Sequence, residues 1–135
     1  MTNNTSSHPE LHARIEASFV RQGMMQHLGA RIVSVAPGDV EIALPYSERV
    51  TQQQGGYHGG AMGALADIAA GYAGLTMAAE GQEVTTVEYK INFLAAFRVA
   101  SFAHVAMWCV QANASSSPRP KWCISTTTAA NRPAP

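Results

Sequence analysis

Residues 58–74 read HGGAMGALADIAAGYAG, and this run of alanine and glycine predicts one long helix that carries a single carboxylate, Asp67. At helical spacing, the larger apolar residues fall on one face: Leu65, Ile68, Tyr72 and Leu75. Small residues surround Asp67 on another face: Gly60, Gly63, Ala64, Ala70, Gly71 and Gly74. We expect the first face to be core and the second to let another backbone or a ligand come close to Asp67.

The start of this helix offers groups that suit acyl transfer. His58 is interpreted as a helix cap or another hydrogen-bonded structural group rather than as a general base. Gly59 and Gly60 can present free backbone N–H groups at the positive end of the helix dipole, which suits an oxyanion hole. Gly-Gly is also an ordinary loop sequence, so its conjunction with Asp67 carries the interpretation.

Asp67 has a structural alternative, because a helix carboxylate can pair with a lysine or arginine across an interface. The catalytic interpretation is favoured, since an unpaired carboxylate among small apolar neighbours can act as a base or a nucleophile.

A membrane span over residues 61–79 is disfavoured. A mid-span Asp costs about 2.5–3.5 kcal/mol, and Ala and Gly stand where a span carries Leu and Ile. A buried helix of a soluble protein is expected.

The flanking sequence predicts further elements. A helix starts near residues 6–9 and ends near Gly23 or Gly29. Residues 30–36 and 40–44 alternate around a Pro-Gly-Asp turn and predict a hairpin. After residues 80–82 close the long helix, residues 84–94 alternate strongly and are rich in β-branched and aromatic side chains, which predicts a strand.

Composition limits the possible functions. The chain has 135 residues, which suits one domain, and a formal net charge of zero, which argues against nucleic-acid and membrane partners. Only 13% of residues are charged, which suggests that part of the surface meets another subunit. Cys109 and Cys123 lack zinc-site spacing, so no metal is expected. The first residues do not resemble a signal peptide, so a cytoplasmic location is expected.

Three motifs resemble the hotdog-fold acyl-CoA thioesterases of the PaaI type: Gln52-x-x-Gly55-x-x-His58-Gly-Gly60, Ala64-Leu-Ala-Asp67 and Thr86-Val-Glu-Tyr-Lys-Ile-Asn-Phe-Leu94-Ala95. The resemblance covers about residues 19–95. It implies an α+β hotdog fold, in which an antiparallel sheet wraps around a long central helix, and a homodimer or homotetramer. It also implies hydrolysis of acyl-CoA at the subunit interface, with no metal and no cofactor apart from the coenzyme A of the substrate. Aryl and medium-chain acyl groups are candidate substrates.

The resemblance also implies roles for individual residues. Asp67 corresponds to the general base or nucleophile, and Gly59 to the oxyanion-hole donor. Thr86 corresponds to a hydroxyl that helps to orient water, and Gln52 to an Asn or Gln that positions water or the thioester. The residues implied to lie at the substrate are Gly55, His58 and Gly60.

The resemblance stops after Ala96, and the tail over residues 97–135 departs from the family pattern. Glu88 is the last acidic residue of the chain. Reading the tail codons in a shifted frame forces Val-Val from Met107-Trp108-Cys109, and permits a hairpin sequence of the kind that the family has here. We therefore favour the hypothesis that the reading frame shifts near residues 97–99. Codons in the gene that cannot yield this hairpin would contradict it.

The alternative is a divergent C-terminus read in frame. Residues 102–110 still alternate and can form a strand, residues 121–128 can form another, and the residues between them then form a loop. One domain over residues 1–135 is expected either way, with residues 1–8 disordered.

Two functions from different classes follow. The first is an acyl-CoA thioesterase. The second is a non-catalytic hotdog module that binds acyl-CoA, favoured if the altered tail has disabled turnover. A hotdog dehydratase is disfavoured, because we expect its chemistry to need a catalytic histidine, and His58 precedes the helix where the oxyanion donors belong.

Overall fold

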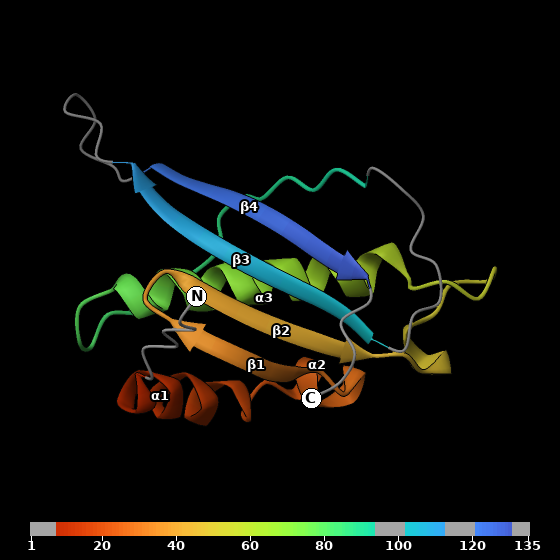
Figure 1. Cartoon of the computed structure of the whole chain (residues 1–135), viewed down its shortest axis with the longest axis horizontal. Coiled ribbons are helices and arrows are strands. Elements are labelled where there is room, and N and C mark those ends of the chain that lie inside the picture. The colour runs from red at the N-terminus through yellow and green to blue at the C-terminus, as the bar shows by residue number, and fades with distance from the viewer. Residues whose placement is uncertain (1–7, 94–101, 113–120, 131–135) are drawn as a thin grey trace, which may run out of the picture.

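The computed structural model describes residues 8–93, 102–112 and 121–130 (Figure 1). Their elements, in chain order, are α1 (Pro9–Phe19), α2 (Gly23–Leu28), β1 (Arg31–Ala36), β2 (Asp39–Pro45), the 3-10 helix η1 (Glu48–Val50), α3 (Gly59–Met77), β3 (Phe102–Ala112) and β4 (Lys121–Ala130). Residues 1–7, which we expect to be disordered, lie outside the described part. The helix α3 lies against β2 and β3, and α1 lies beside β1 (Figure 1).

The sheet is antiparallel, with strand order β1-β2-β3-β4. The predicted hairpin is confirmed: β1 and β2 pair from Ala36↔Asp39 outward, which leaves Pro37 and Gly38 as the turn. Gly38 has a φ of 73°, a left-handed conformation that glycine adopts without steric cost. The Gly38 N–H donates to Thr76 Oγ1 over 2.7 Å, so the hairpin turn is fixed to the C-terminal end of α3.

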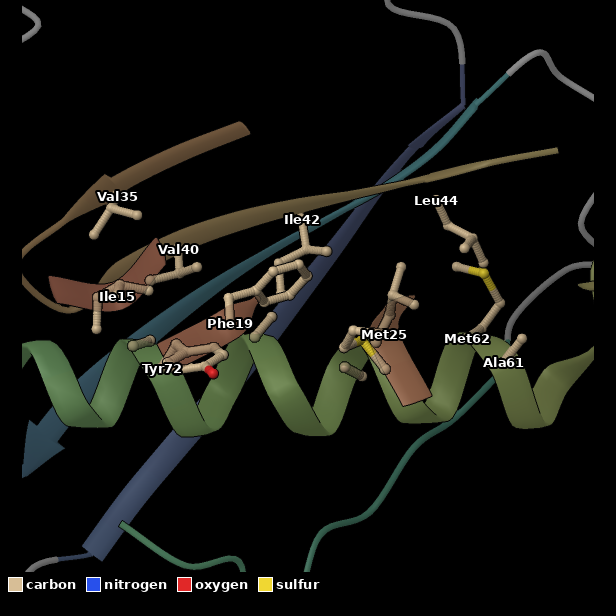
Figure 2. Close-up of a cluster of buried hydrophobic side chains, with 14 of the residues drawn as sticks. Ile15, Phe19, Met25, Val35, Val40, Ile42, Leu44, Ala61, Met62 and Tyr72 are labelled. Carbon is tan, nitrogen blue, oxygen red and sulfur yellow. The ribbon is translucent and has the colours of Figure 1, made fainter. Parts of the chain in front are cut away.

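The predicted N-terminal helix is divided in two. α1 ends at Phe19, and a turn at residues 20–21 leads to the short α2. α2 ends at Leu28 and is capped by Gly29, whose φ is 73°, in agreement with the predicted stop. Ile15 and Phe19 point from α1 into the core against α3 (Figure 2).

The core lies between α3 and β2 (Figure 2). Leu65 and Tyr72 are buried as predicted, whereas Ile68 and Leu75 are partly buried at the margin of the core. The side chains of Val40, Ile42 and Leu44 face α3 from β2. On the helix, small residues widen the buried face: Ala61, Ala66, Ala69 and Ala73. The Tyr72 hydroxyl donates to Ser18 Oγ and accepts from Gln22 Nε2, so this buried polar group is satisfied.

The expectation of a strand at residues 84–94 is wrong for the part that the structure describes. Residues 84–93 form no strand, and Leu94 lies outside the described residues. Both sides of β2 are occupied, by β1 and β3, and residues 84–93 pair with neither of the edge strands, β1 and β4. The segment instead lies against α3, where Ile91 packs on the margin of the core.

The tail contributes two strands of the sheet. β3 and β4 occupy the segments where the in-frame interpretation expects strands, with Val105↔Thr128 among the paired residues. These pairings concern the protein chain and not the gene, so the frame-shift hypothesis remains a prediction. None of the described helices is both long enough and apolar enough to cross a membrane.

Candidate active site

The start of α3 is capped by His58, in agreement with the predicted structural role. His58 has an extended backbone, and its Nδ1 accepts a hydrogen bond of 2.8 Å from the Gly60 N–H. The expectation that Gly59 and Gly60 both present free N–H groups is therefore wrong for Gly60, because its donor is used by the cap. The Gly59 N–H makes no hydrogen bond within the described residues. One backbone donor thus points out of the helix start.

The cap predicts a stability effect. His58→Ala is expected to lower the free energy of unfolding by about 1 kcal/mol, because the Gly60 N–H loses its acceptor. His58→Asn is expected to retain most of this stability, since an Asn side-chain oxygen can accept the same bond. Urea denaturation of the three proteins measures the difference. Equal losses in both variants would show that the cap is not what His58 contributes.

The loop before the helix is held by its own hydrogen bonds. The Gln52 N–H donates to the Gly56 carbonyl over 2.8 Å, and Gln52 Oε1 accepts from the Gln54 N–H over 2.6 Å. Gly55 has a φ of 81°, and its carbonyl accepts from the Tyr46 hydroxyl over 2.9 Å. The Gln52 side-chain oxygen is therefore turned toward the loop, which leaves its amide nitrogen as the group that can reach a ligand.

Asp67 lies eight residues into α3, on the small-residue face. Its Oδ1 is buried and has no hydrogen-bond partner among the described residues. A buried carboxylate oxygen without a partner is costly, so such atoms are concentrated at sites with a function. Within the same residues no lysine or arginine forms an ion pair with Asp67. Pairing of Asp67 with a lysine or arginine of another subunit stays a prediction.

The segment over residues 83–93 runs back along the small-residue face of α3 (Figure 1). A Cβ placed on Gly74 would lie 3.7 Å from Val84, one on Gly63 would lie 3.3 Å from the Tyr89 hydroxyl, and one on Gly59 would lie 3.4 Å from the Phe93 ring. This face is therefore approached by side chains of the same protein chain, and its approach by another backbone or a ligand stays a prediction.

Thr86 lies between Val84 and Tyr89, so its backbone passes the part of α3 that holds Asp67. The Thr86 side chain is exposed and makes no hydrogen bond to the described residues. The contacts of Tyr89 and Phe93 with the helix were missed by sequence reasoning. Alternation placed both residues on one side of a strand but could not tell which element that side would meet.

The two chemical groups on α3 are far apart within one chain. Asp67 follows Gly59 by eight positions, which corresponds to a rise of about 12 Å along the helix axis. The Gly59 N–H points out of the helix start, away from Asp67, because the first N–H groups of a helix project along its axis.

No group of histidine, cysteine, aspartate and glutamate side chains suited to a metal ion occurs in the described part of the chain.

Comparisons with known proteins identify the family of this chain. Residues 54–117 match the model of the thioesterase superfamily. A thioesterase family protein of known structure from Silicibacter pomeroyi is 37% identical, with 75% of this chain and 74% of that chain covered and a TM-score of 0.71. The chain belongs to the thioesterase superfamily. The family match extends beyond Ala96, where we expected the resemblance to stop, and includes residues of β3.

More distant structures support the hotdog fold alone. The Escherichia coli PaaI protein of the phenylacetic acid degradation operon is 17% identical, with 88% of this chain and 82% of that chain covered and a TM-score of 0.71.

A curated protein from Saccharolobus solfataricus, whose name assigns it provisionally to the esterases, is 32% identical over 71 residues. That match covers 53% of this chain, and the chain spans about half the length of this relative.

Proposed function

We propose that this protein hydrolyses acyl-CoA thioesters to a free acid and coenzyme A. The observation that carries the proposal is the buried Oδ1 of Asp67, on a helix that begins with the Gly59 N–H, since neither group has a hydrogen-bond partner among the described residues. Membership of the thioesterase superfamily supports the reaction class. The resemblance to the PaaI type supports acyl-CoA as the substrate.

In the proposed reaction the Gly59 N–H binds the thioester carbonyl oxygen and stabilises the negative charge that develops on it. Asp67 then acts in one of two ways. As a general base, it takes a proton from water while the water oxygen attacks the carbonyl carbon; as a nucleophile, its carboxylate attacks directly, and water hydrolyses the resulting anhydride. In both routes the carbon–sulfur bond breaks, and the coenzyme A thiolate leaves and takes up a proton.

The separation of the two groups supports a site shared between subunits. The oxyanion donor must lie about 3 Å from the carbonyl oxygen, and the attacking atom about 3–3.5 Å from the carbonyl carbon. A carbonyl bound by the Gly59 N–H lies beyond the start of the helix, on the side away from Asp67. Its distance from Asp67 of the same subunit therefore exceeds the helical rise of about 12 Å between the two residues. One site therefore combines Gly59 of one subunit with Asp67 of another in a homodimer or homotetramer.

Release of free thiol from a panel of acyl-CoA substrates tests the proposal. The panel includes aryl and medium-chain acyl groups, and the rate is compared with that of each thioester without protein. We expect turnover of at least one class. If acyl-CoA binds in a calorimetric titration while no thiol is released, the protein is the non-catalytic binding module instead.

A further inference from the structure

The hydroxyl of Tyr89 lies over the turn of α3 that precedes Asp67. It is 3.3 Å from the position that a Cβ on Gly63 would take, closer than most Cβ contacts. Gly63 is itself buried, so the absence of a side chain there leaves the space that the hydroxyl occupies. Tyr89 itself is 46% exposed, so its outer side faces solvent.

Asp67 shares this turn. Residues four apart on a helix lie on one face with their Cβ positions about 5–6 Å apart, so Asp67 is the neighbour of Gly63. Helical side chains lean toward the N-terminus, which directs the Asp67 carboxylate back over Gly63. Helix geometry therefore places the carboxylate beside the same glycine that the Tyr89 hydroxyl approaches.

These two groups are not hydrogen-bonded to each other. Oδ1 of Asp67 is buried without a partner among the described residues, and Tyr89 makes no hydrogen bond to them. A hydroxyl can both donate and accept, whereas a carboxylate only accepts, so one water can bridge the Tyr89 hydroxyl and the second carboxylate oxygen of Asp67, Oδ2, which is not among the buried atoms without a partner. That arrangement leaves the second proton of the water free and one water lone pair directed outward.

We infer that Tyr89 is a positioning residue, which holds the attacking water beside Asp67. The inference rests on the proposed function and assigns the general-base route to it. Asp67 removes one proton from the water, and the water oxygen forms the new bond to the carbonyl carbon as the carbon–sulfur bond breaks. The departing thiolate takes the proton from Asp67, and Tyr89 keeps its own proton throughout.

Steady-state kinetics of Tyr89→Phe test this role. The variant keeps the ring and loses the hydroxyl, so kcat is expected to fall about tenfold, the value of one lost hydrogen bond, while KM stays unchanged. In an Asp67→Asn background the same change is expected to have no further effect, because the water is no longer activated. Thr86→Val is measured in parallel, since the resemblance assigns the water-orienting hydroxyl to Thr86.

Gly63→Ala provides a second variant that retains the hydroxyl. Its methyl group would lie 3.3 Å from the Tyr89 oxygen and displace it by a few tenths of an ångström, so kcat is expected to fall in wild type and not in Tyr89→Phe. Gly71→Ala, which meets no atom within 4 Å, controls for the added helix propensity in thermal unfolding.

The outcomes separate this inference from the proposed function. A wild-type protein that releases no thiol overturns both. Active wild type with unchanged kcat in Tyr89→Phe, or a fall in kcat with Thr86→Val alone, overturns the role of Tyr89 and leaves the thioesterase proposal standing. Equal falls for Tyr89→Phe in the wild-type and Asp67→Asn backgrounds would show that Tyr89 does not act through Asp67.

Discussion

Asp67→Asn is expected to reduce thioester hydrolysis by about 10²–10⁴-fold, the range for loss of a general acid or base. The amide has nearly the same shape as the carboxylate but cannot take a proton from water or attack the thioester. Folding should be unaffected or improved, because Oδ1 of Asp67 makes no hydrogen bond with the part of the chain that the structure describes. Thiol release gives kcat/KM, and urea denaturation gives the stability.

Asp39→Asn is the matched control for this prediction. Asp39 begins β2 beside the hairpin turn, which is attached to the C-terminal end of α3, and we place it outside the site. Its variant should hydrolyse acyl-CoA at the wild-type rate. More than a tenth of wild-type activity in Asp67→Asn, or lost activity that accompanies unfolding, would contradict the assigned role.

Gly59→Pro is expected to reduce kcat by about 10²–10³-fold, the cost of removing one oxyanion-hole donor. Proline is favoured at the first position of a helix and lacks an N–H, so it deletes the donor with little change in the backbone. His58 has φ −69° and ψ 130°, the conformation that a residue before proline prefers. Gly59→Ala is the control, since it places a Cβ 3.4 Å from the Phe93 ring but keeps the N–H.

Mixing the two inactive variants tests whether the site is shared. When Gly59→Pro and Asp67→Asn subunits are unfolded together and refolded, half of the dimers are hybrids, and each hybrid has one site with both native groups. About a quarter of the wild-type activity should return. No recovery, although hybrids form, would place both groups in one subunit and contradict the shared site.

The sequence predicted those elements whose signals are local. The Pro37-Gly38 turn, the start of α3 and the burial of Leu65 and Tyr72 were predicted correctly, because turn residues, a cap and helical periodicity act over a few residues. The strand expected at residues 84–94 was wrong. Alternation at Tyr89 and Phe93 indicates that one side of the segment faces another element, here α3, but a strand also needs a paired neighbour, which depends on residues distant in sequence.

The features of the candidate site likewise fall into those that local sequence predicts and those that depend on distant contacts. The sequence by itself determined the chemical groups: one carboxylate on a small-residue helix, glycine N–H groups at its start and a histidine before them. Only the tertiary structure decided which of these are available. It shows that the His58 cap uses the Gly60 N–H, and that Oδ1 of Asp67 is buried without a partner among the described residues. It also brings Tyr89 over Gly63. Hydrogen-bond satisfaction and close approach depend on residues distant in sequence, which no local pattern records.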